Sequence, residues 1–557
     1  MPEEHEGVET KSSDSPEVYK QTKFMAWFEK AFPWLLVSGA TLGLTLMIIL
    51  PIIFFQEKTG DQLKAQSDLR LALLYTTGGA IAALGLLETY RKNTNDRTKA
   101  NADINATLKN QDHQTKVLKE QIRQFDENAF KERKAERRER YTKAVEQLGS
   151  QEPPVRMGGV YTLVGLVDEW LEEENLSEYE RFKEGQVIIN NLCSYIRSPY
   201  TLASRYDELS QDKPTGSYED RAQAFYADKA TLKSEADVRL GIIKEIHDRL
   251  RSPGGKDPGA WSDFEYDFSG STFFYPVNLM YSYYTRPVNF SRSTFQDLAS
   301  FLDSTYLIAN FIGATFQKSA SFCGSTYFVT AGFIGTTYQG EADFRGSIYK
   351  SQALFRSSVY NKEVLFGGGG SWPSGGSIYQ GQTDFSNSIY QGQADFSKSI
   401  YQEEASFSDS VYQEEASFSG SIFYNDIYFG QDGDNGSFSR FTDCAPQFYD
   451  EKNRKNTLFD SPDNDFSVEN GRGYPIYRNL EGLPLGCKFL SSEQKEYLAD
   501  NFQEIEKINN KLREVKDPKE KAELSKKLQA LTEELHEWRE EATTVKVEDA
   551  AAEDTEN

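Results

Sequence analysis

Residues 377–421 read SIYQGQTDFSNSIYQGQADFSKSIYQEEASFSDSVYQEEASFSGS, in which one sequence motif is repeated four times with small changes. Aromatic residues recur in it at steps that alternate between six and five residues, so the full unit is eleven residues long. The same spacing extends backwards to Phe268, with one slip near Phe311 where five-residue steps follow each other. An insertion, GGGGSWPSGG at 367–376, interrupts the pattern, which fades after Phe429. A repeat this regular predicts a stack of equivalent short structural units.

A small residue stands two positions before each aromatic residue, as Ser399 does before Tyr401. Residues i−2 and i of an extended strand point to the same side. Each short strand is therefore predicted to bury one small and one large side chain, and the polar residues between strands are predicted to form solvated turns. The predicted core comprises Phe344, Tyr349, Phe355, Tyr360, Phe385, Tyr390, Phe396, Tyr401, Phe407, Tyr412, Phe418 and Phe423, with Ala394, Ala405 and Ala416 as small partners.

An eleven-residue period is also compatible with a right-handed helical supercoil. The composition argues against that alternative, because Ser, Gly, Tyr and Phe dominate the repeat and strong helix formers are few. A strand-and-turn unit that cannot bury its own face instead predicts a solenoid, in which each coil stacks on the next. Each buried tyrosine hydroxyl needs a partner, which we expect to be a turn, a water or the coil surface.

The repeat resembles the pentapeptide-repeat family, whose consensus is a small residue, a polar residue, Leu or Phe, and two polar residues. Residues 394–398, ADFSK, match that consensus at every position. The extra residue in every second unit resembles the Phe-rich branch of the family. The resemblance implies a right-handed, four-sided β-helix with about 22 residues per coil, so that residues 264–430 would form roughly seven coils.

The whole chain has 557 residues and a net charge of −24, and it is too long for a single core. Its four cysteines are far apart and lack a CxxC spacing, which argues against a disulfide framework and a zinc site and favours a reducing compartment. The expected fold class is multidomain α+β. We expect two transmembrane helices, a coiled-coil stalk, a small helical domain, the β-helix solenoid and a C-terminal helical hairpin.

Two apolar stretches near the N-terminus are candidates for membrane spans. Residues 34–55 run for 22 residues without a charge, and residues 71–87 form a second, shorter apolar run. We expect a transmembrane hairpin at 34–90, after an N-terminal segment at 1–33. Glycine motifs in both stretches, Gly39-x-x-x-Gly43 and Gly79-x-x-x-Ala83, would allow the two helices to pack closely.

The distribution of Lys and Arg predicts the orientation of this hairpin. Both flanks carry several basic residues, whereas the connecting loop at 56–68 carries only Lys58 and Lys64. Cytoplasmic segments are enriched in Lys and Arg, so both termini are expected in the cytoplasm. The protein is then a multi-pass protein of the inner (cytoplasmic) membrane, with the lipid bilayer as its first partner.

Residues 91–138 are predicted to form a coiled-coil stalk. Its seam alternates four-residue and three-residue steps and includes two polar members: Ile104, Leu108, Gln111, Thr115, Leu118, Ile122 and Phe125. The seam would either pair with a second copy or belong to a single solvated helix. The basic run KERKAERRERYTK at 131–143 could contact anionic lipid or nucleic acid, but its interleaved glutamates favour a salt-bridged helix face. Direct nucleic-acid binding is therefore not expected.

Residues 139–256 are predicted to form a helical domain, in which Gly149 and the following prolines end the first helix. Further helices are expected at 184–197 and 235–250, and the domain would cap the first coil of the solenoid. The segment at 70–170 resembles the sequence that follows a two-span anchor in bacterial pentapeptide-repeat proteins.

The solenoid is assigned to residues 257–430 and is followed by an irregular cap at 431–490. A helical hairpin is predicted at 491–540, where Leu and aromatic residues recur at four-residue and three-residue steps and Asp517 would cap the second helix. The hairpin is either a docking surface or folded onto its own chain. The acidic tail at 541–557 is expected to be disordered.

No catalytic motif is apparent, and we expect no enzyme activity, no cofactor and no metal. The glutamates at positions 403, 404, 414 and 415 recur at eleven-residue spacing and are interpreted as a solvated acidic ridge rather than a calcium site. The function we expect is a membrane-anchored scaffold, whose rigid rod in the cytoplasm binds a protein partner. The alternative is an acidic, DNA-mimicking rod that binds a type II topoisomerase, as the resemblance allows, since residues 264–430 carry 15 acidic and 8 basic residues.

Overall fold

The structure, a computed structural model, describes residues 16–55, 60–251, 257–368, 375–430, 438–469, 471–515 and 518–545. The chain divides into two units, at residues 1–129 and 130–557, which are described separately. The fold class is the expected mixture: long apolar helices, a β-solenoid of about seven turns and a C-terminal pair of helices. The predicted helix cap at Asp517 and the residues of the acidic tail beyond 545 lie outside the described residues.

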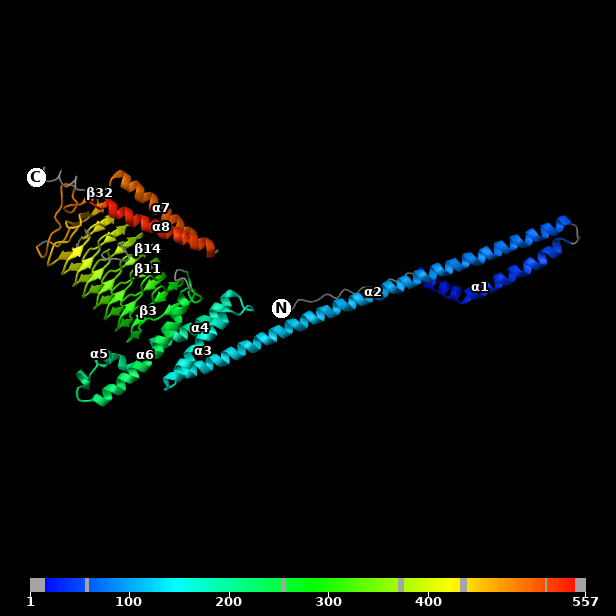
Figure 1. The fold of residues 1–557 in the computed structure, drawn as a ribbon, viewed down its shortest axis with the longest axis horizontal. Coiled ribbons are helices and arrows are strands. Elements are labelled where there is room, and N and C mark those ends of the chain that lie inside the picture. The colour runs from blue at the N-terminus through cyan, green and yellow to red at the C-terminus, as the bar shows by residue number, and fades with distance from the viewer. Residues whose placement is uncertain are drawn as a thin grey trace. The chain divides into compact units, whose positions relative to one another are not determined.

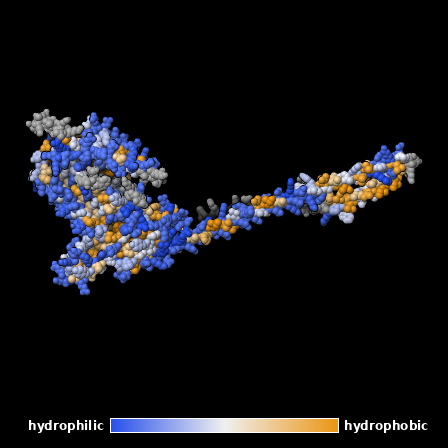
Figure 2. Space-filling view, viewed as in Figure 1, coloured by the Kyte–Doolittle hydropathy of each residue, from blue (hydrophilic) through white to orange (hydrophobic). Residues whose placement is uncertain are grey.

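The first unit contains α1 (Pro16–Phe54) and most of α2 (Gly60–Leu148). Both helices contain a segment that is long and apolar enough to cross a membrane by length and composition, although α2, with 89 residues, is apolar only near its start. Figure 2 shows hydrophobic residues gathered along this pair. Gly43 lies against α2, since an added Cβ would come within 2.6 Å of Thr77 Cγ2, whereas Gly39 and Gly79 face open space. Of the two predicted glycine motifs, only Gly43 makes a close contact.

The second unit begins with helices that follow the predicted pattern. After the end of α2 come α3 (Pro153–Leu171), α4 (Glu178–Arg197), α5 (Tyr206–Leu209) and α6 (Ala222–Leu250), with 3-10 turns at Thr201–Arg205 and Gly216–Tyr218. Ser177 and Glu180 form a reciprocal capping box at the start of α4, which explains why the helix begins there.

The first coil of the solenoid is covered by these helices. Gln186 on α4 donates a hydrogen bond to the Glu265 carbonyl at 2.8 Å, and His247 on α6 contacts the Met280 carbonyl at 2.7 Å. A Cβ added to Gly185 would come within 2.6 Å of Phe264, so α4 approaches the coil closely. The edge that would otherwise be exposed is therefore capped, as the sequence predicted.

The solenoid has four faces, each a column of parallel strands. Figure 1 shows the strands stacked coil upon coil. Face 1 consists of β1 (Tyr266–Asp267), β5 (Val288–Asn289), β15 (Gln352–Leu354), β19 (Thr383–Asp384), β23 (Ala405–Ser406) and β27 (Ile427–Tyr428). Face 2 consists of β2 (Thr272–Phe273), β6 (Thr294–Phe295), β9 (Thr315–Phe316), β12 (Thr337–Tyr338), β16 (Val359–Tyr360), β20 (Ile389–Tyr390), β24 (Val411–Tyr412) and β28 (Arg440–Phe441).

Face 3 consists of β3 (Val277–Asn278), β7 (Ala299–Ser300), β10 (Ala320–Ser321), β13 (Ala342–Asp343), β17 (Val364–Leu365), β21 (Ala394–Asp395) and β25 (Ala416–Ser417). Face 4 consists of β4 (Tyr283–Tyr284), β14 (Ile348–Tyr349), β18 (Ile378–Tyr379), β22 (Ile400–Tyr401), β26 (Ile422–Phe423), β31 (Leu458–Phe459) and β32 (Lys488–Phe489). The longer strands β8 (Thr305–Asn310) and β11 (Thr326–Gly332) belong to faces 4 and 1 at once. A small antiparallel pair, β29 (Tyr449–Asp450) and β30 (Lys455–Asn456), lies in the cap.

Strand register shows the length of each coil. Tyr266 pairs with Val288, so that coil has 22 residues. Val288 pairs with Ala309, a coil of 21 residues that contains the predicted slip near Phe311. Ala353 pairs with Thr383, 30 residues further on, because this coil carries the insertion, whose residues 369–374 lie outside the described part of the chain.

The structure buries all fifteen predicted core residues, and none is more than 2% exposed. Rings of consecutive coils stack, as Phe396 does on Phe418 at a centroid distance of 5.1 Å. Rings of the opposite faces 1 and 3 meet edge to face across the core, as Phe396 does with Phe407. Both geometries are favourable for aromatic pairs, so the ladder adds specific contacts to the burial of apolar surface.

The corners of each coil explain the alternation of five and six residues. Outside the insertion, the five-residue step follows each ladder Phe of faces 1 and 3 from Phe268 to Phe418, and the residue two positions after that Phe has a positive φ, as at Gly346 (φ 65°) and Asn387 (φ 55°). A left-handed residue turns the chain in fewer positions, and Gly or Asn adopts it at little cost. The six-residue step follows the aromatic residue of faces 2 and 4, at a wider corner.

The tyrosine hydroxyls do not reach the coil surface, which corrects one expectation. All ten tyrosines of the ladder, from Tyr284 to Tyr412, have a fully buried hydroxyl without a hydrogen-bond partner of acceptable geometry among the described residues. Each follows a Ser or Thr two positions earlier, whereas the Phe residues of face 3 mostly follow Ala. Burial raises the pKa of Tyr412 well above its ordinary value, and the neighbouring Ser410 hydroxyl opposes that rise.

The solenoid continues past residue 430, where the sequence predicted that it would end. Strand β28 pairs with β24, and β31 pairs with β26, so an additional coil forms with irregular spacing. Phe441 stacks on Tyr412, and Phe459 stacks on Phe423. The aromatic ladder therefore extends into the segment that was predicted to be irregular.

Candidate interaction surfaces

Faces 2 and 4 carry the same sequence motif, Ser-Ile-Tyr or a close variant of it. Because the repeat has eleven residues and a coil has 22, successive copies of this motif fall on opposite faces. The Tyr of each segment points into the core, and the preceding β-branched residue points outward. The outward column of face 4 is Ile348, Ile378, Ile400, Ile422 and Leu458. The outward residues of face 2 in the same coils include Val359, Ile389 and Val411.

The C-terminal hairpin covers face 4, so it is folded onto its own chain. Helices α7 (Ser492–Glu514) and α8 (Pro518–Ala542) run beside the strands (Figure 1). The outward isoleucines at 378, 400 and 422 are at most 1% exposed and form one apolar cluster with residues of the hairpin. The buried hairpin residues of that cluster are Leu498, Phe502, Ile505 and Leu535. The first three are spaced i, i+4 and i+7, which places them on one face of α7.

Polar contacts fix the position of α7 on the rod. Lys350 donates a hydrogen bond to Asn509 Oδ1 at 2.7 Å, and Lys495 forms an ion pair with Asp460. The ring of Phe502 meets Tyr424 edge to face at 5.4 Å. Contacts at both ends of the helix thus set its register against the coils.

The last turns of α8 carry a buried cluster of charged groups. Arg539 has no exposed surface, and its guanidinium donates hydrogen bonds to the Lys398 carbonyl and to Glu540. Lys455 pairs with Glu540 and also donates to the Glu540 carbonyl at 2.7 Å. Burial alone would raise the pKa of Glu540, but the hydrogen bond from Lys455 and the charge of Arg539 lower it. These contacts clamp the end of α8 to the coil surface.

His536 is the neutral member of this cluster. Burial, reinforced by the charge of Arg539, lowers the pKa of His536 to about 4. The described end of the insertion lies against it, because a Cβ added to Gly375 would come within 2.6 Å of His536 Nδ1. A side chain at position 375 would therefore collide with the His536 ring unless one of the two shifted, and this described end of the insertion packs against the hairpin.

The basic run at 131–143 is paired with acidic residues of α3, of the turn that follows α3 and of α4. Arg137 forms a 2.8 Å ion pair with Glu173, and Arg140 forms a 2.7 Å ion pair with Glu169. Arg137 also stacks over the ring of Trp170 at 4.7 Å. Much of the basic face therefore closes the helical domain, as the interleaved-charge interpretation favours.

The four glutamates at 403, 404, 414 and 415 do not form one ridge, which corrects their interpretation from the sequence. The Glu404 carbonyl accepts from Thr383 on face 1, and the Glu415 carbonyl accepts from Ala394 on face 3. An eleven-residue step is half a coil, so the two pairs lie at opposite corners. Among the described residues, no group of three His, Cys, Asp or Glu side chains is arranged to hold a metal ion.

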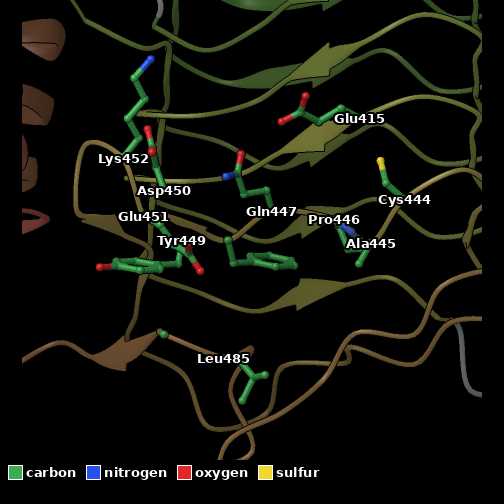
Figure 3. A pocket seen from close by; sticks show the side chains of 12 residues that line it. Glu415, Cys444, Ala445, Pro446, Gln447, Tyr449, Asp450, Glu451, Lys452 and Leu485 are labelled. Carbon is green, nitrogen blue, oxygen red and sulfur yellow. The ribbon is translucent and has the colours of Figure 1, made fainter. Parts of the chain in front are cut away.

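An open hollow of about 1040 Å³ lies at the end of face 3 (Figure 3). Its walls include the carboxylates of Glu415, Asp450 and Glu451, with Lys452 and Cys444 beside them. Burial and the nearby carboxylates, Glu415 first, raise the pKa of the Cys444 thiol. The thiol therefore stays protonated at neutral pH, which makes it a poor nucleophile.

Comparisons of the chain with protein-family models, with curated proteins and with solved structures find no match.

Proposed function

We propose that this protein is a membrane-anchored scaffold of the pentapeptide-repeat type, whose rigid rod binds a protein partner in the cytoplasm. The observation that carries the proposal is the state of the four faces. Face 4 is covered by the hairpin of the same chain, whereas outward residues on the other faces, such as Ile389, remain partly exposed. A stack of hydrogen-bonded coils with an aromatic core presents these flat faces without a cost in ordering entropy on binding.

The anchor is proposed to be the α1–α2 pair, inserted in the inner membrane with both termini in the cytoplasm. Lys64→Cys tests the orientation, because it places a thiol near the tip of the pair, where few basic residues occur. We expect an impermeant thiol reagent to label this variant from outside intact cells. Labelling of thiols at both termini, but not at position 64, would reverse the topology.

The stalk is proposed to pair two copies of the chain. Its apolar seam residues are more than half exposed in the single chain, including Leu118 at 56% and Phe125 at 73%. A coiled coil would bury them. Leu118→Asp is expected to reduce the mass of the detergent-solubilised particle to that of one chain, as measured by light scattering.

The experiment that tests the scaffold is crosslinking and capture of full-length protein from solubilised host membranes. Deleting the hairpin is an unsuitable control, because it would expose the isoleucine column of face 4. Charge substitutions of one outward residue per face are better matched: Leu354→Asp on face 1, Ile389→Asp on face 2 and Leu365→Asp on face 3. Loss of one crosslinked partner with one face variant supports the scaffold. Partners that persist in all three variants would contradict it.

The topoisomerase alternative receives less support from the structure. A DNA mimic requires a continuous stripe of negative charge, and the closest glutamate pairs lie at opposite corners of the coil. Capture of topoisomerase subunits in the same crosslinking experiment would favour this alternative.

A further inference from the structure

In the part of the chain that the structure describes, face 2 presents a partly exposed strip, whereas the column with the same sequence motif on face 4 holds two helices. The strip consists of Val359, Ile389 and Val411, which are in register in three consecutive coils. Ile389 is 39% exposed, whereas Ile378 and Ile400, the outward residues of the two face 4 segments that flank it in sequence, are at most 1% exposed. Both columns are aliphatic in these coils, so the difference in exposure comes from the helices that cover face 4.

We propose that the face 2 strip docks an amphipathic α-helix of a partner protein, which lies along the rod as α7 does on face 4. This inference rests on the proposed scaffold function and names the surface and the kind of partner. The occupant is a helix because the same chain already binds one to the equivalent column, through Leu498, Phe502 and Ile505.

The dimensions of the two elements agree. Adjacent coils are about 4.8 Å apart, and three aligned residues therefore span about 10 Å. A helix advances about 5.4 Å per turn, so apolar residues at i, i+4 and i+7 lie over successive coils. Two turns of helix would cover Val359, Ile389 and Val411. A strand from a partner would fit less well, because each coil already pairs its backbone with the coils above and below.

The flanks of the strip suit a helix with a basic end. In the coil of Val411, the charged residues at both corners are acidic: Asp409, Glu414 and Glu415. In the coil of Val359, Lys362 is followed by Glu363, and Arg356 forms a 3.8 Å ion pair with Asp384 on face 1. A helix with basic residues over the coil of Val411 would therefore be oriented along the rod.

The probe for the test is a fluorescent peptide of residues 491–545 of this chain, added to the full-length protein in detergent. Face 4 is already occupied, so we expect saturable binding of one peptide per chain. Ile389→Asp should weaken that binding at least ten-fold. The matched control is Leu354→Asp, which changes an isolated outward residue of face 1 in the same way and should leave binding unchanged. A peptide with Leu498, Phe502 and Ile505 replaced by alanine should not bind.

Three outcomes would overturn the inference. In the first, the peptide binds neither the unchanged protein nor a variant. In the second, Ile389→Asp does not change the affinity, because the peptide exchanges with the hairpin on face 4. In the third, Ile389→Asp abolishes self-association of the full chain, so that a second copy occupies the strip. Equal melting temperatures of the two variants would show that the fold is retained. Failure of the peptide to bind leaves the scaffold itself to be judged by the crosslinking experiment.

Discussion

Faces 2 and 4 are built from the same eleven-residue repeat, but their outward residues have different surroundings. Face 4 carries Ile at four successive repeats of its column and then Leu458, whereas face 2 changes from Thr337 to Val359, Ile389, Val411 and finally Arg440. Each fully buried aliphatic side chain contributes about 1.5–3 kcal/mol. A longer column of larger residues can therefore hold two helices permanently, while a shorter column of smaller residues is suited to reversible contact.

The second difference lies in polar contacts beyond the repeat. The end of α8 is clamped on face 4 by Arg539, Glu540 and Lys455, and the insertion places Gly375 against His536. The part of the chain that the structure describes has no such clamp on face 2. The repeat therefore supplies two similar faces, and the length of the apolar column together with contacts from outside the repeat decides which of them is occupied.

The largest effect is expected where both faces share a core. Phe396→Ala removes a ring that stacks on Phe366 and Phe418 and leaves a cavity. We expect a loss of about 3–5 kcal/mol in the free energy of unfolding. Thermal or denaturant unfolding of the full chain measures it. An unchanged melting temperature would contradict the inward position of Phe396, on which the account of both faces depends.

An Asp substitution in the outward column should have a different effect on each of the two faces. Ile400→Asp buries a carboxylate against the hairpin and is expected to weaken its docking by about 3 kcal/mol or more, because a buried unpaired charge is strongly unfavourable. Val411→Asp on face 2 meets solvent and should change stability by less than about 0.5 kcal/mol. Hydrogen exchange of residues 492–542 measures the release of the hairpin. Equal protection in the two variants would contradict the difference in cover.

Acid should release the hairpin from face 4 and leave face 2 unchanged. His536 faces Arg539 and Glu540 on α8 and Gly375 on the rod, with Lys398 and Lys455 close to the same cluster. Its pKa is lowered to about 4, so protonation favours the undocked state, in which the pKa returns to about 6.5. Docking is therefore complete above pH 6.5 and weakens as the pH falls toward 4, by up to about 3 kcal/mol.

Hydrogen exchange of α8 between pH 7 and pH 4.5 checks this sign, after correction for the intrinsic exchange rate. His536→Gln is the control, because it removes the titrating group and should flatten the pH dependence. A hairpin that loosens equally in that variant would assign the effect to other groups, such as Glu540.

Much of the solenoid could be predicted from the sequence, because its contacts repeat at a fixed step. The spacing of Phe and Tyr, the slip near Phe311 and the insertion at 367–376 all reappear as strand register. The cover of face 4 could not be predicted, since it pairs α7 and α8 with residues far earlier in the chain, such as Ile400, which is 98 residues before Leu498. No local pattern distinguishes a hairpin that docks on its own rod from one that docks on a partner.

The prediction that the glutamates form one acidic ridge was wrong for a geometric reason. Eleven-residue spacing implies stacking only if one coil has eleven residues, and a coil has 22. The same arithmetic could have shown that Ser-Ile-Tyr segments alternate between opposite faces. The core of the extra coil was missed because Phe441 and Phe459 follow at irregular steps, which only the paired strands reveal.

The smallest effect is expected inside the two faces, at the tyrosine hydroxyls. Tyr401→Phe on face 4 and Tyr412→Phe on face 2 each remove a buried hydroxyl that has no hydrogen-bond partner among the described residues. Removal of such a group should leave the free energy of unfolding unchanged or raise it by up to about 1 kcal/mol. Phe423, one coil beyond Tyr401 on face 4, already shows that the ladder accepts a ring without a hydroxyl. The two variants should agree, because the faces differ outside the rod and not within it.

A loss above about 1 kcal/mol in the free energy of unfolding of either variant would mean that its hydroxyl is hydrogen-bonded. The simplest partner is the Ser two positions earlier. In that case Ser399→Ala and Ser410→Ala would reproduce the loss on faces 4 and 2, respectively.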